Sequence, residues 1–389
     1  MKRNLLRSRD GHSEGRVGFV ELFFDLVFVF AITQVTAYIA HDPTWTRLLE
    51  GMAILIAVWW AWDAYAWLGN SAGTDEGLFR VTLFAALAAM LLAAIAVPHA
   101  FGRDALAFGI AYAVVRALHI GAYAIIARDD PQLSHVVRVL GGWMLPAATL
   151  LIVAGIVDAG TPRTLCWVVG LTAEIGGLYF FGAVEQWKVQ AAHMAERFGL
   201  IIIIALGESI VALGAGAQDH ALDAGLITAV LLGIAVACAM WWAYFDVVAL
   251  VAARRFQRAE GAERALIARD SYTYLHAPMV AGIILFSLGV KKTLAHYGDP
   301  LDAVPALGLC GGVALYLLAH VAFRLRNVHS LNSARLIVAI VLCALAPVAT
   351  AIPALVALAI TAALMVSLLT YEFVRFHEAR ERLRHTLLR

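Results

Sequence analysis

Charged residues are scarce in this chain. Asp, Glu, Lys and Arg make up 15% of its 389 residues, whereas hydrophobic residues make up 62% and the mean hydropathy is +0.80. Because a soluble domain normally carries about 25% charged residues, this composition argues against a soluble protein. The four cysteines lie in apolar stretches without paired spacing, which indicates small buried side chains rather than a disulfide or zinc framework.

Motifs of several soluble enzyme classes are also missing. The sequence has no phosphate-binding loop, no Rossmann glycine pattern and no H-E-x-x-H metal motif. Its basic residues are spread over many short polar segments, which gives no support for nucleic-acid binding. We therefore expect no metal site and no nucleic-acid partner, and no sequence feature indicates a cofactor.

Long apolar stretches dominate what is present. Twelve of them recur, at residues 18–40, 50–69, 79–98, 104–126, 138–157, 164–182, 198–216, 224–250, 272–295, 303–324, 335–351 and 353–374. About 20 apolar residues cross a bilayer as a helix, so the sequence predicts an all-α integral membrane bundle of about twelve transmembrane helices. If the N-terminus is cytoplasmic, 23 Lys and Arg residues fall on the cytoplasmic side and 5 on the other side. This split favours both termini in the cytoplasm.

The sequence contains two similar halves. Shifts of 183 and later of 201 positions superimpose residues of the same chemical type: Asp25 on Glu208, Trp59 on Trp242, Asp63 on Asp246, His119 on His320 and Pro146 on Pro347. We expect two parallel six-helix repeats at residues 17–182 and 198–374, joined by an amphipathic linker at 183–197. Basic cytoplasmic tails are expected at residues 1–16 and 375–389.

Two motifs resemble a known family. FVELFFDLVFVFAITQ at residues 19–34 and RFGLIIIIALGESIVALG at residues 197–214 are similar to the low temperature requirement A (LtrA) family of bacterial membrane proteins. The resemblance covers nearly the whole chain. It implies a polytopic protein of a bacterial-type plasma membrane, and it implies no particular reaction. The run FFDLVFVFAIT is also similar to the F-S-D signature of a potassium-channel family built from six-helix repeats, with phenylalanine in place of serine.

Ionisable residues inside the apolar stretches are the candidate site residues, because a charge there costs about 2.5–3.5 kcal/mol on insertion scales. They are Glu21, Asp25, Asp63, Arg116, His119, Glu208, Asp246, His276 and His320. We expect Arg116 to pair with Asp25 or Asp63, since buried charges are normally paired. Counted at 1.5 Å per residue, most of the set falls in the cytoplasmic half. The sequence therefore predicts a buried polar cluster there, either as an ion or solute site or as ion pairs that fix helix register.

Tryptophans and glycines give further expectations. Trp59, Trp60, Trp62, Trp241 and Trp242 are expected to pack in the bundle, with stacking on a cationic ligand as the alternative. Glycines at positions 207, 214 and 216 are expected to allow close helix packing.

Two function classes follow from these features. The first is a transporter or channel for a small solute or ion, because buried ionisable residues are typical of transport pathways. The alternative is an integral membrane enzyme that acts on a lipid or isoprenoid substrate. A membrane sensor without turnover is a third reading. The expected partners are the lipid bilayer and a small molecule or ion, and a homo-oligomer is compatible with the sequence.

Overall fold

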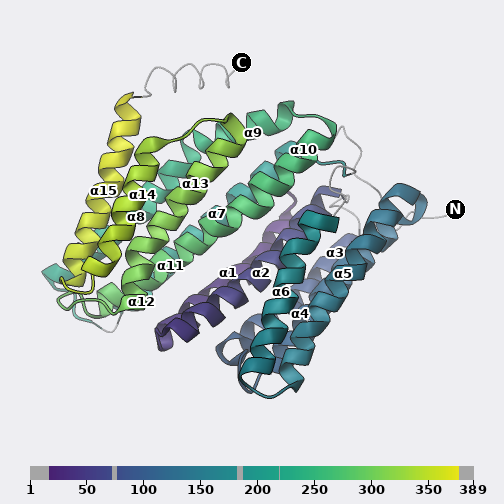
Figure 1. Cartoon of the computed structure of the whole chain (residues 1–389), viewed down its shortest axis with the longest axis horizontal. Helices are drawn as coiled ribbons and strands as arrows, with labels where there is room; N and C mark the ends of the chain where they lie inside the picture. Colours follow the sequence, from purple (N-terminus) through teal and green to yellow (C-terminus); the bar gives the residue numbers. More distant parts are fainter. Residues whose placement is uncertain (1–16, 72–76, 182–186, 219, 376–389) are drawn as a thin grey trace. The chain divides into compact units, whose positions relative to one another are not determined.

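The computed structural model describes residues 17–71, 77–181, 187–218 and 220–375 (Figure 1). These residues are almost entirely helical, and their extended pairing is limited to an isolated bridge between Pro300 and Pro353. The predicted all-α class is therefore confirmed. The chain divides into two compact units. Unit 1 comprises Met1–Ile201 and Phe256–Ala277, and unit 2 comprises Ile202–Arg255 and Pro278–Arg389.

Unit 1 is built mainly from six long helices. They are α1 (Phe19–His41), α2 (Trp45–Ser71), α3 (Gly77–Ala96), α4 (Ala105–Ile126), α5 (Pro131–Ile156) and α6 (Thr161–Phe181). Short 3-10 turns, η1 (Val97–His99) and η2 (Ala127–Asp129), follow α3 and α4. The unit also contains the first turns of α7 (Ala191–Ala217), α10 (Gly261–Ile267) and the π-helical segment η4 (Ala268–Tyr274). Helix α2 contacts α1, α4 and α6, so it lies at the centre of the unit.

Unit 2 contains the rest of α7 and the later helices. These are α8 (Ala224–Phe245), most of α9 (Val248–Arg258) and α11 (Leu275–Ala295), α12 (Ala303–Ala306), the π-helical η5 (Leu307–Gly311), α13 (Gly312–Val328), α14 (Ser333–Val348) and α15 (Ala354–Arg375). Helix α15 packs on α8 and α14, and α13 packs on α14.

Several helices start where a side chain caps the backbone. Asp130 accepts hydrogen bonds from the amides of Gln132 and Leu133, both at 3.0 Å, just before α5 begins at Pro131. Proline suits this first position, because its missing N–H would have no helical partner there. The Asn332 side chain caps α14 in the same way, by accepting from the Arg335 amide. These polar residues set the helix boundaries within otherwise apolar sequence.

Glycines allow the closest helix contacts in both units. In unit 1, a Cβ atom at Gly109 or Gly155 would overlap backbone atoms at the α4–α5 contact. By contrast, a Cβ at Gly207 or Gly214 would meet no heavy atom within 4 Å. The expectation of close packing was wrong for these two glycines, because their faces of α7 are open in the described structure. It holds for Gly216, whose Cβ would lie 3.0 Å from the Lys291 carbonyl oxygen.

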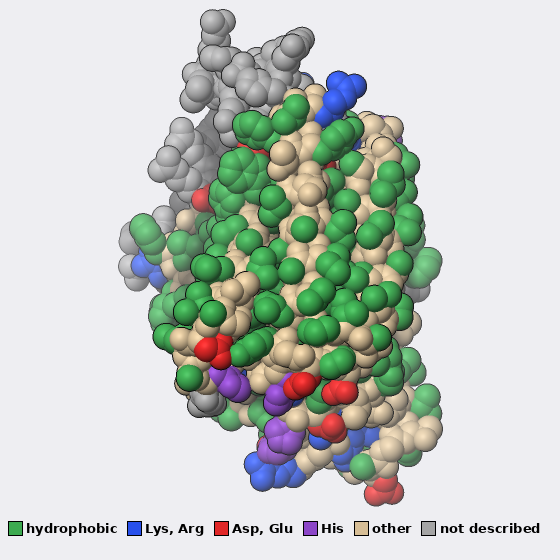
Figure 2. Space-filling view, turned by 90° about the vertical axis from the view of Figure 1, so that its left-hand side faces the viewer, with side chains coloured by type: hydrophobic (Ala, Val, Ile, Leu, Met, Phe, Trp, Pro, Cys, Tyr) green, Lys and Arg blue, Asp and Glu red, His purple; other side chains and the backbone are tan. Residues whose placement is uncertain are grey.

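The helices are suited to a bilayer. Ten helical segments in the described residues are long and apolar enough to span a membrane. Helix α6 and the 16-residue α14 are not among them. Figure 2 shows hydrophobic side chains over most of the face on the side of α15, with acidic and histidine side chains gathered near its lower edge. In water so large an apolar surface would be unfavourable, and in lipid it is expected.

All twelve predicted apolar stretches form helices, although their boundaries differ in places. The stretch 224–250 is divided, because α8 ends at Phe245 and α9 starts at Val248. Of the expected linker, residues 191–197 belong to α7, while 183–186 lie outside the described residues. The tails 1–16 and 376–389 also lie outside them. The number of spans and the two six-helix repeats stay predictions.

Candidate functional site

The most deeply buried ion pair of unit 1 joins Arg116 on α4 to Glu174 on α6. Arg116 Nε lies 3.1 Å from Glu174 Oε1, and Nη2 lies 2.6 Å from Oε2. The guanidinium also donates from Nη1 to the Trp60 carbonyl oxygen of α2, at 3.0 Å. Both charged side chains have 0% exposure. Three helices are thereby joined through one arginine, with the two-point geometry that suits guanidinium and carboxylate groups.

A second ionic group lies where α1 meets α2 and the first turns of α7. Asp25 Oδ1 accepts from Arg197 Nη2 and from Trp62 Nε1, each at 3.0 Å. Glu21 lies one turn before Asp25 and contacts the His193 ring at 3.1 Å. Each of these side chains is at least 97% buried. Asp25 Oδ2 nevertheless has no hydrogen-bond partner in the described structure.

The remaining buried carboxylate of unit 1 is Asp63 on α2. Its Oδ1 accepts from the Thr273 hydroxyl at 2.8 Å, and that hydroxyl in turn accepts from Trp67 Nε1 at 2.9 Å. Thr273 belongs to the π-helical η4, a local irregularity that is frequent at functional sites. In the part of the chain that the structure describes, Asp63 has no Lys, Arg or His within ion-pair distance.

Asp63 also borders a small cavity of about 30 Å³, together with Arg116, His119 and several aromatic residues. His119 is 2% exposed, and neither of its ring nitrogens has a hydrogen-bond partner in the described structure. Its ring packs against Tyr65 and Tyr123. The cavity is large enough for a water molecule beside a carboxylate and an imidazole.

Unit 2 contains a comparable arginine cluster. Arg335 on α14 donates to both carboxylate oxygens of Glu372 on α15, each at 2.8 Å. Its Nη1 lies 2.9 Å from His320 Nδ1, and its Nη2 donates to the Ala243 carbonyl oxygen at 3.1 Å. Because a guanidinium only donates, His320 Nδ1 must accept this bond. Asn332 donates a further hydrogen bond to Glu372, at 2.8 Å.

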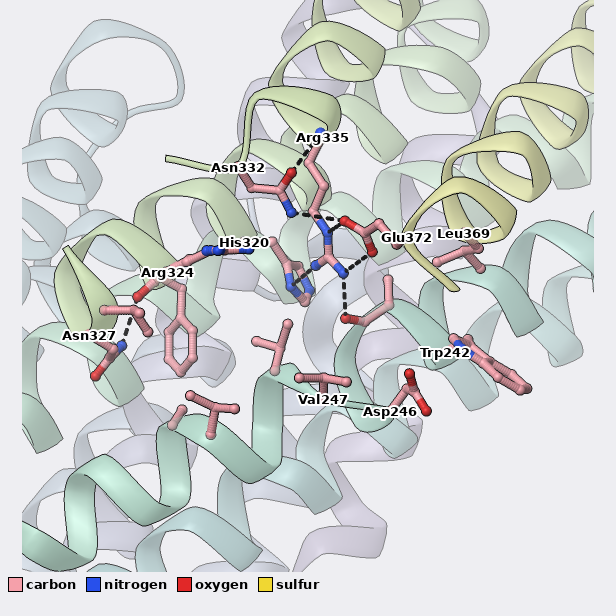
Figure 3. Close-up of a pocket in the computed structure, with 16 residues that line it drawn as sticks. Trp242, Asp246, Val247, His320, Arg324, Asn327, Asn332, Arg335, Leu369 and Glu372 are labelled. Atoms are coloured by element: carbon pink, nitrogen blue, oxygen red, sulfur yellow. Dashed lines mark hydrogen bonds and ion pairs between the residues drawn. The ribbon is translucent and has the colours of Figure 1, made fainter. Parts of the chain in front are cut away.

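A pocket of about 250 Å³ opens beside this cluster (Figure 3). Its walls are mainly apolar. The lining residues include Val247, Val248, Val251, Phe323 and Leu369, and the polar ones are Asp246, His320, Arg324, Asn327, Asn332, Arg335 and Glu372. Trp242, of which 42% is exposed, lies near Asp246 at the edge (Figure 3).

The nine predicted residues are divided between the two units. Unit 1 holds Glu21, Asp25, Asp63, Arg116, His119 and His276, and unit 2 holds Glu208, Asp246 and His320. His276 stacks on Tyr272 and donates from Nδ1 to the Ser271 carbonyl oxygen at 2.9 Å. Glu208 is 2% exposed on α7, whereas Asp246 and His320 line the same pocket. A single cluster of all nine residues stays a prediction.

The predicted partners of Arg116 were wrong. Its ion pair is with Glu174, and neither Asp25 nor Asp63 contacts it as an ion-pair partner. Helices α4 and α6 are the fourth and sixth spans of the predicted topology. Since successive spans alternate in direction, these two run in the same direction. Arg116 and Glu174 are 11 and 13 residues after the first residues of their helices, so they lie at similar depth.

Other participants were missed because they lie near the ends of apolar stretches. Arg197 and Arg335 are among the 23 basic residues that the sequence places on the predicted cytoplasmic side, yet they are 1% and 5% exposed. Glu372, the ion-pair partner of Arg335, and His193, which contacts Glu21, are also buried. A usable signal is that Arg197 opens the second family-like motif, on the helical face that also carries His193 four residues earlier.

The expectation that the tryptophans pack in the bundle holds for three of the five. Trp59, Trp60 and Trp62 are at most 5% exposed, whereas Trp241 and Trp242 are 45% and 42% exposed. Among the described residues, no group of three or more His, Cys, Asp or Glu side chains is arranged to hold a metal ion.

Comparisons with known proteins identify relatives of this chain. It is 29% identical over 319 residues to an uncharacterized protein of Rhizobium meliloti (strain 1021), a match that covers 79% of this chain and 77% of the relative. No solved structure matches the chain. The model of the family described as bacterial low temperature requirement A protein matches residues 16–370. The chain is therefore a member of the low temperature requirement A family of polytopic helical membrane proteins.

Proposed function

We propose that this protein is a proton-coupled transporter of a small solute or ion, and that Asp63 is the group that takes up the proton. The observation that carries the proposal is the absence of a cationic partner for Asp63 in the described part of unit 1. The other buried carboxylates of the unit each have a basic neighbour: Glu21 has His193, Asp25 has Arg197 and Glu174 has Arg116. Asp63 can therefore gain and lose a proton without breaking an ion pair.

The surroundings of Asp63 support this role. The cavity beside it has room for a water molecule and is also lined by His119, which is a second group able to carry a proton. A threonine hydroxyl on a π-helical segment donates a hydrogen bond to Asp63. The π-helical segment continues directly into α11, so protonation of Asp63 is proposed to be coupled to movement of that helix.

The predicted orientation belongs to this proposal. Burial of Arg197 and Arg335 in ion pairs removes them from the loop count, and a large excess of basic residues still lies on the predicted cytoplasmic side. Both termini are therefore proposed to face the cytoplasm.

Proteoliposomes that enclose a pH-sensitive dye test the proposal. A panel of amino acids, sugars and K⁺ is added outside, and internal acidification is recorded. We expect one or more panel members to cause acidification with the wild type, and Asp63→Asn to abolish it while keeping the melting temperature within a few degrees. Asp158→Asn, at an exposed site, is the matched control. Equal acidification by wild type and Asp63→Asn, or none with any solute, would contradict the proposal.

The alternative of a lipid-modifying enzyme is less well supported. In the unit 2 pocket, Glu372 and His320 Nδ1 are both hydrogen-bonded to Arg335, which opposes their use as an acid or base in an enzyme reaction. Recovery of a modified lipid after incubation with membranes would favour the enzyme instead.

A further inference from the structure

We propose that Asp63 exchanges protons with the aqueous phase at the C-terminal end of α2, through water in the cavity of unit 1 and the hydroxyl groups of Tyr123 and Ser71. In the predicted topology this end of α2 faces the cytoplasm. The inference rests on the proposed function for the uptake of a proton by Asp63, and it adds the route of the proton and the side from which it comes.

Two rows of residues run side by side along α2 and α4. On α2, Asp63, Trp67 and Ser71 follow one another at intervals of four residues, so they share one face of the helix. On α4, His119 and Tyr123 are likewise four residues apart. The two helices contact each other, and the Ser71 and Tyr123 hydroxyl oxygens lie 3.4 Å apart. Asp63 and Ser71 are about 12 Å apart along the axis of α2, so the rows connect a buried carboxylate with the end of the helix.

The cavity of unit 1 joins the two rows at their buried end. Asp63, Trp67, His119 and Tyr123 all line it, together with Trp187. Its volume of about 30 Å³ is enough for at least one water molecule. A carboxylate and a tyrosine therefore border the same water-sized space.

Buried polar atoms in the lining indicate that this cavity holds water. Trp187 Nε1 and both ring nitrogens of His119 are buried and make no hydrogen bond in the described structure. The Ala64 backbone lies near the imidazole, but not in hydrogen-bond geometry with it. Buried polar groups are normally paired with protein or with ordered water. A water molecule that accepts from Trp187 and donates to Asp63 would satisfy both, and the imidazole can take part as donor or acceptor.

Other polar neighbours of Asp63 cannot pass a proton on. Thr273 donates to Asp63 and accepts from Trp67 Nε1, and an indole nitrogen is a donor only. Arg116 has no acceptor atom, and its nitrogens are bound to groups on α2 and α6. The Tyr274 hydroxyl, which interacts electrostatically with Asp63, donates to a backbone carbonyl oxygen of α6. The cavity and the hydroxyl groups beyond it remain as the connected path.

Each step of the route moves one proton between neighbouring oxygens. Ser71 takes a proton from bulk water and passes its own to Tyr123, Tyr123 passes its hydroxyl proton to the cavity water, and that water protonates Asp63. Each hydroxyl group and the water keep their number of protons, and Asp63 gains one. Hydroxyl groups both donate and accept, as a relay requires. The Ser71 hydroxyl also reaches the Trp67 carbonyl oxygen at 3.2 Å, which provides the second orientation needed to reset the chain.

The route reaches the surface at Ser71. This residue is the last of α2 and is partly exposed, whereas Tyr123 is fully buried. Trp187 packs edge to face on Tyr123 and on Trp67, with ring centroids 5.1 and 5.4 Å apart. These rings flank the hydroxyl pair with apolar surface, so the pair is the polar connection between the cavity and the end of α2.

Infrared spectroscopy after a rapid pH drop tests the route on the purified full-length protein. We expect the band of a protonated carboxyl group to appear, and Asp63→Asn to remove it. Tyr123→Phe keeps the ring and removes the hydroxyl group, so it should preserve the amplitude of the band and slow its appearance by about tenfold or more. Ser71→Ala should slow it less, since water can enter at a partly exposed position. Tyr316→Phe removes a buried hydroxyl group of unit 2 and is the matched control, with the wild-type rate expected.

A membrane-impermeant thiol reagent tests the side of the membrane. Ser71→Cys should react in inside-out membrane vesicles and not in intact cells. The wild type, which has four cysteines of its own, gives the background reaction. Reaction of Ser71→Cys from outside the cell only, or from neither side, would overturn the assignment of Ser71 as the cytoplasmic end.

The outcomes separate the route from the proposed function. A wild-type rate of protonation in Tyr123→Phe would overturn the route and leave proton uptake by Asp63 intact. If the wild type shows no band that depends on Asp63, both the route and the proposed function fail. If the band appears and is slowed in Tyr123→Phe, but no solute drives acidification of proteoliposomes, the route stands and the transporter is contradicted.

Discussion

Arg116 and Glu174 are 58 positions apart in the chain, and their fully buried side chains form a two-point ion pair. The guanidinium also binds the Trp60 carbonyl oxygen, so α2, α4 and α6 are held at one place. A charge removed from water in this way is stable only while its partner is present.

Removal of one partner should therefore be costly. We expect Arg116→Ala to destabilise the protein by about 3–5 kcal/mol, because Glu174 is left buried without a counter-charge. The double variant Arg116→Met with Glu174→Met should recover most of that loss. Melting temperature in detergent measures both. Arg103→Ala removes an exposed pair with Asp104 and should cost less than about 1 kcal/mol. Equal melting of Arg116→Ala and the control would show that the pair contributes nothing.

The α4–α5 contact gives a prediction with a control on the same helix. Gly155→Ala should destabilise by about 1–3 kcal/mol, because its Cβ would overlap the backbone of Leu106. Gly142→Ala, also on α5, should be neutral or stabilising by up to about 1 kcal/mol, since a Cβ there meets nothing within 4 Å and alanine favours helix. Thermal unfolding of the two variants tests this prediction. A loss of stability in both variants, or in neither, would contradict the close contact at Gly155.

The helices could be predicted from the sequence, whereas the ion pairs could not. Hydropathy alone locates the long helices, because lipid requires a long apolar segment with all backbone groups bonded internally. Which side chain faces which depends on how helices rotate about their axes, and the composition of an apolar run does not fix that rotation. Arg116 was identified as needing a buried partner, yet Glu174 could be chosen only once α4 and α6 were seen beside α2.

The sequence also does not show whether a charged residue at the end of a span faces the lipid head groups or the protein interior. Arg335 occurs three residues after the Asn332 cap, where an arginine usually reaches the lipid head groups. Here it turns inward to Glu372, which itself lies in the last turn of α15. Counting basic residues gives the predicted orientation of a chain but does not separate arginines in loops from those in buried pairs.

A polar contact outside the spans gives a pH prediction. Asp223 accepts from the Leu226 amide at 2.8 Å, as the cap of α8, and from the Tyr297 hydroxyl at 2.6 Å. The backbone bond and then the tyrosine bond hold the pKa of Asp223 below its ordinary value. A carboxyl whose folded pKa is lowered contributes stability above its unfolded pKa, about 3.9, and loses it as the pH falls through the folded value.

The difference in melting temperature between the wild type and Asp223→Ala should therefore be positive at pH 6 and shrink below about pH 4. Tyr297→Phe should show a smaller difference with the same trend, since the backbone cap remains. Asp158→Ala, at an exposed position, serves as the reference for the remaining carboxylates. A difference that grows as the solution becomes more acidic would contradict this account.

Variants of one buried group in unit 1 can distinguish a structural from a functional role. The group consists of Asp25, Arg197 and Trp62. Asp25 holds the arginine through one oxygen, and Arg197 Nε and Nη1 have no hydrogen-bond partner in the described structure. Arg197→Gln should cost about 3–5 kcal/mol, because it leaves Asp25 as a buried charge without its counter-ion. Trp62→Phe keeps the packing and removes one donor, so it should cost about 1–3 kcal/mol.

Adding Asp25→Asn to Arg197→Gln should restore much of the lost stability if the ion pair acts mainly on stability. The decisive measurement is acidification of proteoliposomes by this double variant. Stability recovered together with wild-type flux assigns the pair to helix register, whereas stability recovered without flux places it in the transport path beside Asp63.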